Sequence, residues 1–437
     1  MIEGLRSFQN VFKVPELKRR VLISLGLLAA YRIGAHVPTP GIDAVALAEL
    51  FNTMQNSLLG MVDLFSGGNL RRLTVFALGI MPYISASIIL QLLTVVIPAL
   101  ERLAKEGEAG RKKITQYTRY GTIALSLIQS FGIAVGLESM RSGSGAALVP
   151  EAGWGFRLLT MLTLTTGTTL IMWLGEQISE KGIGNGISLI IFAGIVVRLP
   201  SAIVSSYTLI SSGELQLFVF LGLVVMMVAV TAAVIVMQEG QRKIPVQYAK
   251  RVVGRRMYGG QSTHIPLRVN TAGVIPVIFA SSLILFPATL TSFIKHPWMQ
   301  GISEALSPGR FTYTVLYCAL IIFFAYFYTA IVFNPIDLAD NMKKYGGFIP
   351  GVRPGKKTAE YIDRTLTRIT LPGAVFLALI SVLPDFLIQW FNVPFYFGGT
   401  SLLIVVGVAL DTVRQMESHL LMRNYEGFLR KKTKIHA

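Results

Sequence analysis

The chain has 437 residues, of which 52% are hydrophobic and only 14% are charged. Its formal net charge is +17, from 40 Lys and Arg residues against 23 Asp and Glu residues. A soluble helical protein is excluded, because its helices would carry apolar stripes and not the uncharged belts found here. The single cysteine, Cys318, excludes an intramolecular disulfide and a metal site built from cysteines.

Ten apolar segments recur along the chain, and a helix needs about 20 such residues to cross a bilayer. They predict an all-α integral membrane protein with ten transmembrane helices. The fifth segment is short and rich in glycine, which makes it the weakest of the ten. The segments are residues 21–37, 75–97, 120–137, 158–174, 183–197, 215–237, 271–294, 313–333, 371–391 and 393–410.

Lys and Arg residues are concentrated in alternate loops. With the N-terminus inside, the cytoplasmic segments hold 32 of the 40, the outer loops hold five, and three lie near span ends. Cytoplasmic loops retain Lys and Arg, so both termini are predicted to be cytoplasmic. We expect a multi-pass protein of the cell inner (plasma) membrane, whose first span is an uncleaved anchor and not a signal peptide.

Ten spans divide into two sets of five, with a boundary near residue 210. Because five is odd, the second set starts on the opposite side of the membrane, as in an inverted repeat around a central pathway. We therefore predict an N-terminal half, residues 1–210, with spans one to five. The C-terminal half, residues 211–437, holds spans six to ten.

No enzyme signature is complete in the sequence. Residues 351–358 have the wrong glycine and lysine spacing for a phosphate loop, and residues 182–186 do not match a dinucleotide-binding turn. We expect no enzymatic activity, no catalytic residue, no cofactor and no metal. The span interiors are nearly free of Asp, Glu and His, which ion-coupled transporters commonly use. A secondary transporter of a small solute nevertheless stays open as an alternative, and a membrane scaffold that recruits cytosolic partners is a third.

An apolar segment between the first two spans, residues 57–70, is too short to cross the membrane. It is interpreted as a re-entrant segment that enters a cavity. A helix lying on the outer surface is the alternative. Gly67 and Gly68 follow the apolar stretch and would permit a hinge.

Isoleucines recur three or four positions apart in several spans, so each pair shares one helix face. Apolar constrictions of this kind gate some pores by excluding water. Lipid-facing or packing residues are the alternative. The positions are Ile80, Ile84, Ile187, Ile191, Ile275, Ile278 and Ile404.

Two cytoplasmic loops, residues 238–270 and 334–370, are long, basic and rich in turns. Topology and attraction to anionic lipids explain their charge, but not their length. We interpret them as docking surfaces, with a phosphate backbone among the candidate partners.

Several stretches together resemble the SecY family, the central subunits of the bacterial Sec protein-conducting channel. The resemblance covers essentially the whole chain. Its residues are 76–87 (FALGIMPYISAS), 175–177 (GEQ), 182–188 (GIGNGIS), 261–264 (QSTH), 333–335 (FNP), 351–355 (GVRPG) and 394–401 (PFYFGGTS).

The resemblance implies a ten-helix channel that passes unfolded secretory polypeptides and releases hydrophobic segments sideways into lipid. It implies a pore ring formed by Ile80, Ile84, Ile187, Ile191, Ile278 and Ile404. Residues 57–70 would be a plug, with Leu58, Leu59, Met61, Val62, Leu64 and Phe65 as its apolar face. A lateral gate would carry polar contacts from Ser85, Gln91 and Asn270.

The resemblance also implies partners. These are the SecE and SecG subunits, the SecA motor ATPase, the ribosome, and precursors of secretory and membrane proteins, beside anionic lipids. The cytosolic partners would dock on Arg242, Lys243, Lys250, Arg251, Arg255, Arg256, Arg353, Lys356 and Lys357.

Overall fold

Contacts within the chain divide the computed structural model into two compact units. The first unit comprises Met1–Tyr207, Ser282–Arg310 and Val408–Ala437, and the second comprises Thr208–Ser281 and Phe311–Gly407. The division into halves at residue 210 stays a prediction. The structure describes residues 14–53, 60, 63, 66–140, 147–213, 216–248, 251–253, 256–258, 262–293, 301, 305–307, 309–391 and 399–433.

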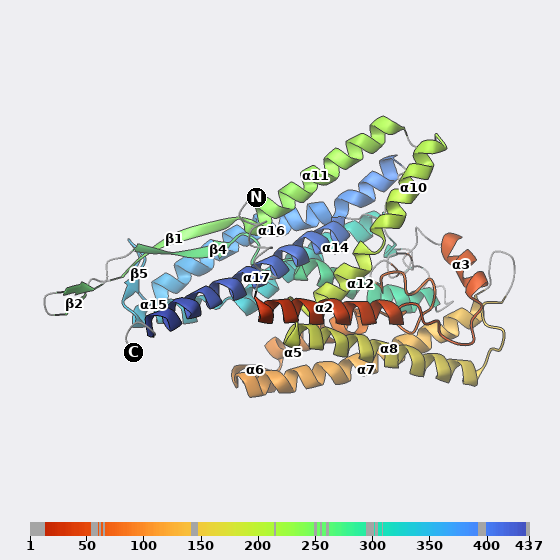
Figure 1. The fold of residues 1–437 in the computed structure, drawn as a ribbon, viewed down its shortest axis with the longest axis horizontal. Helices are drawn as coiled ribbons and strands as arrows, with labels where there is room; N and C mark the ends of the chain where they lie inside the picture. The colour runs from red at the N-terminus through yellow and green to blue at the C-terminus, as the bar shows by residue number, and fades with distance from the viewer. Residues whose placement is uncertain are drawn as a thin grey trace. The chain divides into compact units, whose positions relative to one another are not determined.

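The first unit is built from helices (Figure 1). Pro15, Pro82 and Pro98 occupy the first turn of three of them, where a missing N–H costs nothing. Asn185 caps another helix by accepting hydrogen bonds from the backbone N–H groups of Ile187 and Ser188. The helices are α2 (Pro15–Gly34), α3 (Ala44–Thr53), α5 (Met81–Val96), α6 (Pro98–Lys105), α7 (Glu108–Ser139), α8 (Trp154–Lys181), α9 (Gly186–Val196) and α10 (Leu199–Ser211).

Helices α7 and α8 pack against each other and are joined by an ion pair near each end. Near one end, Arg119 Nε and Nη2 donate to the two carboxylate oxygens of Glu176, at 2.9 and 2.8 Å. Near the other end, Arg157 donates twice to Glu138 Oε2, at 2.9 and 2.6 Å. The Glu138 side chain is 9% exposed. Two charge-assisted contacts of this kind fix the register of the helix pair.

The turn between α8 and α9, residues 182–186, has its backbone groups bonded to side chains of other helices. Ser24 Oγ of α2 accepts from Ile183 N at 2.9 Å, and Gln415 Oε1 accepts from Gly184 N at 2.9 Å. No side chain fits at Gly186, because a Cβ there would lie 2.0 Å from the carbonyl oxygen of Gly175. The turn is therefore held by specific bonds, and its glycine permits the close approach.

The second unit holds four helices completely, and three more are divided between the two units. The four are α11 (Leu217–Glu239), α14 (Phe311–Val332), α15 (Pro335–Lys344) and α16 (Lys356–Phe391). The three shared helices are α10, whose last four residues belong to the second unit, α12 (Ile275–Phe293) and α17 (Gly399–Thr433).

The loop at residues 238–270 forms strands, which the sequence analysis did not predict. Strand β1 (Gln241–Tyr248) pairs antiparallel with β4 (Ser262–Arg268) and with β5 (Gly347–Phe348), and β4 and β1 run side by side in Figure 1. Strands β2 (Arg251–Val253) and β3 (Arg256–Tyr258) form a second, two-stranded sheet. Alternate residues of β1, Ile244 and Val246, are buried, as expected for a strand with one covered face.

Strands β1 and β4 share one apolar core with helices α15 and α16. The core joins the loop at residues 238–270 to the loop at residues 334–370 in a single folded unit. Its buried members are Ile244, Val246, Leu267, Met342, Ile349, Ile362 and Leu366.

The described residues include six helices that are long and apolar enough to cross a membrane, or seven if the bent pair α5–α6 counts as one span. The helical membrane fold is thus confirmed, while the count of ten stays a prediction. Two predicted bounds were wrong. Residues 75–80 form turns before α5, and the fifth span does not end at residue 197, because α9 and α10 together form an apolar span of 26 residues, Gly186–Ser211.

The Glu138–Arg157 pair generates a stability prediction. Glu138→Gln removes the negative charge but keeps the size of the side chain, so Arg157 loses its counter-ion. We expect the melting temperature in detergent solution to fall by several degrees. Glu360→Gln is the control, because the Glu360–Lys357 pair is exposed and such pairs stabilise little. Equal melting curves for wild type and Glu138→Gln would show that the α7–α8 pair does not depend on this bond.

Candidate functional site

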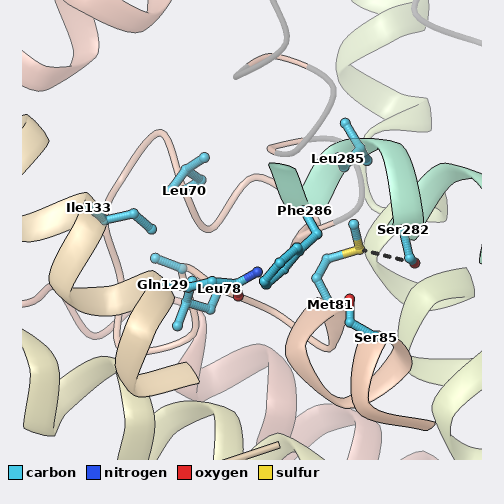
Figure 2. Close-up of a pocket in the computed structure, with 10 residues that line it drawn as sticks. Leu70, Leu78, Met81, Ser85, Gln129, Ile133, Ser282, Leu285 and Phe286 are labelled. Atoms are coloured by element: carbon cyan, nitrogen blue, oxygen red, sulfur yellow. Dashed lines mark hydrogen bonds between the residues drawn. The ribbon is translucent and has the colours of Figure 1, made fainter. Parts of the chain in front are cut away.

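A small cavity of about 20 Å³ lies in the first unit, among α5, α7 and α12. Figure 2 shows Gln129 of α7 and Phe286 of α12 pointing toward each other across it. The lining residues are Leu70, Ala77, Leu78, Met81, Ser85, Gln129, Ile133, Ser282, Leu285 and Phe286.

Two lining side chains bring buried polar atoms to this apolar cavity. Ser85 is 7% exposed and Gln129 is 5% exposed. Ser85 Oγ and Gln129 Oε1 have no hydrogen-bond partner among the atoms that the structure describes. Beside them, Ser282 Oγ donates to Met81 Sδ at 3.8 Å, which is a weak contact. A cavity of this size is large enough for one water molecule. The three helices thus meet mainly through apolar contacts, with a polar spot between them.

The three predicted gate residues lie in different surroundings. Ser85 lines the cavity. Gln91, farther along α5, donates to Ser87 Oγ of its own helix at 3.3 Å. Asn270, in the second unit, donates to the carbonyl oxygen of Gly273 at 2.9 Å and thereby closes the turn before α12. The structure therefore brings Ser85 together with Gln129 and Ser282, which the sequence analysis had not assigned to the gate. A polar residue inside an apolar span was the available signal for Gln129.

The predicted pore isoleucines are mostly buried. Ile80, Ile84 and Ile191 in the first unit are at most 4% exposed, and Ile187 is half-buried. Ile187 packs near α8, since a Cβ on Gly175 would lie 3.1 Å from Ile187 Cγ1. Ile278 and Ile404 belong to the second unit and are also buried. The ring of six therefore stays a prediction.

The predicted plug lies largely outside the described residues. This applies to Leu58, Leu59, Met61, Val62, Leu64 and Phe65. Within residues 57–70 the structure describes Gly60, Asp63 and residues 66–70. Asp63 is 4% exposed and pairs with Arg198, which lies between α9 and α10. Arg198 is one of the three basic residues near predicted span ends, the others being Arg32 and Arg157.

The predicted docking residues that the structure describes lie over the shared apolar core. Arg242 and Lys243 are exposed on β1, and Arg353, Lys356 and Lys357 are exposed before and at the start of α16. The backbone around Arg353 is fixed, because Thr358 Oγ1 donates to the Arg353 carbonyl at 3.0 Å and the neighbouring Val352 packs against the core. Lys250 and Arg255 lie outside the described residues, as do the side chains of Arg251 and Arg256.

Metal ligands do not gather in the part of the chain that the structure describes. No group of three or more His, Cys, Asp and Glu side chains there could hold a metal ion.

Comparison with known proteins identifies relatives over nearly the whole chain. The chain is 53% identical over 420 residues to "Protein translocase subunit SecY" of Escherichia coli (strain K12), which covers 95% of this chain and 94% of that protein. It is 49% identical over 439 residues to the protein of that name from Streptomyces coelicolor, which covers 98% of this chain and 100% of the relative.

Solved structures share the fold at lower identity. "The structure of a protein conducting channel" aligns with a TM-score of 0.60 at 18% identity and covers 93% of this chain and 96% of that chain. "Sec61 in the Canine ribosome-channel complex from the endoplasmic reticulum" aligns with a TM-score of 0.56 at 16% identity, with the same coverage. The SecY family model matches residues 74–413. Together with the identities above, this match establishes that the chain belongs to the SecY family.

Proposed function

We propose that this chain is the channel-forming subunit of a protein translocase. It passes unfolded secretory polypeptides across the membrane and releases hydrophobic segments sideways into lipid. The observation that carries the proposal is the 53% identity to a protein translocase subunit over 95% of this chain. The multi-pass helical fold agrees with a conduit, and no enzymatic step is proposed.

Apolar partition supplies the energy for sorting substrates in this proposal. A leucine, isoleucine, phenylalanine or valine at the centre of a membrane helix gains about 0.3–0.6 kcal/mol. A segment of about 20 such residues therefore gains about 6–12 kcal/mol on entering lipid, while a charged segment gains nothing. The cavity among α5, α7 and α12 has a mostly apolar lining. This supports the proposal that these helices separate there to form the lateral gate. Ser85, with Gln91 and Asn270, is proposed to tune this gate.

The proposed pore ring consists of Ile80, Ile84, Ile187, Ile191, Ile278 and Ile404, and residues 57–70 are proposed to form its plug. One structural relative, titled "The plug domain of the SecY protein stablizes the closed state of the translocation channel and maintains a membrane seal", supports a plug in this family. Branched apolar side chains can surround a passing chain and exclude water without binding that chain tightly.

The cytosolic partners are proposed to dock on the loops at residues 238–270 and 334–370, which share one apolar core. The structural relatives include ribosome complexes of Sec61 and yeast Ssh1, which supports the ribosome as one partner. SecE, SecG and the SecA motor are proposed from family membership alone. We propose an inner-membrane location with both termini in the cytoplasm, based on the distribution of Lys and Arg residues.

Reconstitution tests the proposed function. The purified chain, with its partner subunits, is placed in proteoliposomes with a motor ATPase, ATP and a secretory precursor. We expect the precursor to become protected from added protease only when the channel, motor and ATP are all present. Uptake of a small solute without precursor protection would instead identify a transporter, and recruitment of the motor without either would identify a scaffold.

The isoleucine ring generates a conductance prediction. Ile84→Asn together with Ile191→Asn should hydrate the constriction and increase ion leak through channels that hold no substrate. The matched control is Ile88→Asn with Ile190→Asn, which changes two equally buried isoleucines of the same helices outside the predicted ring. Planar-bilayer recordings give the leak, and melting in detergent shows whether both double variants are folded. Equal leak in the two would assign the ring isoleucines to packing.

The fixed turn around Arg353 generates a docking prediction. Gly351 and Gly355 hold φ values of +80° and +100°, which favour glycine, and the hydrogen bond from Thr358 Oγ1 to the Arg353 carbonyl restrains the turn that presents the exposed Arg353. Arg353→Glu should severely reduce motor-driven translocation and leave the melting temperature nearly unchanged. Lys344→Glu, at an exposed site near the end of α15, should cost much less. Similar mild losses for both would show that the loop contributes only diffuse positive charge.

A further inference from the structure

Asp63 is a centre of hydrogen bonds in the first unit. Its carboxylate Oδ2 accepts from Arg198 Nη2, and its Oδ1 accepts from the backbone N–H of Arg71 at 2.9 Å. Its carbonyl oxygen accepts from Arg198 Nη2 at 3.2 Å, from Ser66 Oγ at 3.0 Å and from Gly68 N at 2.9 Å. One buried residue thus joins the turn at residues 66–70 to a part of the chain 135 positions away.

The turn at residues 66–70 has close contacts with α9 and α2. Gly67 and Gly68 have φ values of +74° and +85°, which favour glycine. A Cβ on Gly67 would lie only 2.8 Å from the Cα of Gly194 on α9. Tyr31 of α2 donates to the Ser66 carbonyl at 3.4 Å and accepts from Asn69 Nδ2 at 3.2 Å. These contacts hold the turn in one position against α9 and α2. Asp63 precedes the turn by three residues in the sequence.

Arg198 lies in an unfavourable place for a charge. It is located at the break between α9 and α10, inside the apolar span Gly186–Ser211. Ionisable residues within membrane spans are costly, and they pair with one another or mark a functional site. Asp63 supplies the pairing charge here.

In the pair with Asp63, fewer arginine nitrogens bond the carboxylate than in the two ion pairs that join α7 and α8. Arg119 bonds Glu176 through two nitrogens and two oxygens, whereas Arg198 reaches Asp63 through Nη2 alone. Arg198 Nε is buried without a partner among the described atoms. A contact held by one nitrogen separates at lower cost than a two-bond fork.

A second guanidinium crowds the same carboxylate. A Cβ on Gly68 would lie 3.4 Å from Arg198 Nη2 and 3.7 Å from Arg71 Nε. Burial lowers the pKa of Arg71 from its ordinary value, the Asp63 carboxylate opposes that shift, and the charge of Arg198 adds to it. The two guanidinium groups therefore repel each other, and the Asp63 carboxylate is the negative charge that attracts both. Once that carboxylate moves away, the repulsion favours continued separation of the turn from Arg198.

We propose that Asp63 and Arg198 are a positioning pair that holds the turn at residues 66–70 in the closed channel and must separate before the channel opens. The inference rests on the proposed function. Asp63 and the turn lie within the proposed plug, residues 57–70, and the inference assigns to the contact between Asp63 and Arg198 the role of holding that turn.

Ion leak through channels without substrate tests the pair. We expect Asp63→Asn and Arg198→Gln each to raise the leak about tenfold, which corresponds to about 1.4 kcal/mol. The double variant should leak no more than the leakier single variant, because both changes break one interaction. Unchanged leak in the single variants, or effects that add in the double variant, would overturn the proposal.

A matched pair controls for general loss of stability. Glu138→Gln and Arg157→Gln break another ion pair of the same unit that does not touch the turn. These variants should melt at a lower temperature and leak as little as wild type. If they leak as much as Asp63→Asn, the leak reflects destabilisation and the proposal is wrong. Motor-driven translocation by wild type in the same vesicles tests the proposed function separately.

Locking the contact provides the opposite perturbation. Asp63→Cys and Arg198→Cys are combined with Cys318→Ala, which removes the lone native thiol. A short, cleavable bis-maleimide joins the two introduced thiols. Linked channels should stop translocating, and cleavage of the linker should restore transport. Normal translocation by linked channels would show that this contact need not separate.

Discussion

Buried charges and backbone groups cannot obtain compensation from lipid, so the protein itself must supply their partners. That constraint explains where the polar residues of the first unit lie. Asp63 pairs with Arg198, Glu138 pairs with Arg157, and the turn between α8 and α9 bonds to Ser24 and Gln415. Three of these contacts join segments more than 130 positions apart in sequence, and the Glu138–Arg157 pair joins two consecutive helices. A few polar bonds therefore position helices whose remaining surfaces are apolar and similar to one another.

The constraint also distinguishes permanent contacts from contacts that can part. The α7–α8 pair has an ion-paired carboxylate near each end, so separating these helices would leave four charged side chains without partners. Around the cavity, α5, α7 and α12 meet mostly through apolar side chains, and the contact from Ser282 to Met81 is weak. When apolar helix surfaces separate within the membrane, they contact lipid tails that are as apolar as the side chains themselves. Few hydrogen bonds are lost, so the separation costs little. The first unit thus combines a rigid helix pair with an adjoining surface suited to motion.

The helical membrane fold could be predicted from sequence, because a long uncharged apolar segment has few interpretations other than a membrane-spanning helix. The end of the fifth span was missed because Arg198 interrupts an apolar run, and only its partner Asp63 explains why the helices continue past it. Strands β1 and β4 were not predicted, because the loop is basic and rich in turn residues. The alternating buried residues Ile244 and Val246 are too short a pattern to indicate a strand against that background. The grouping of Ser85 with Gln129 and Ser282 depends on three helices meeting, which no single segment encodes.

Helix α16 has a mechanical consequence. It runs without a break for 36 residues, Lys356–Phe391, which at about 1.5 Å per residue makes a rod about 54 Å long. Its first turns carry Ile362 and Leu366 of the apolar core that joins the loops at residues 238–270 and 334–370, and its described part, Lys356–Leu383, is long and apolar enough to cross a membrane. A helix resists bending far better than a loop does. Force applied to that apolar core would therefore be transmitted along the helix to its apolar part, and a partner bound to the core could move the apolar part without contacting it.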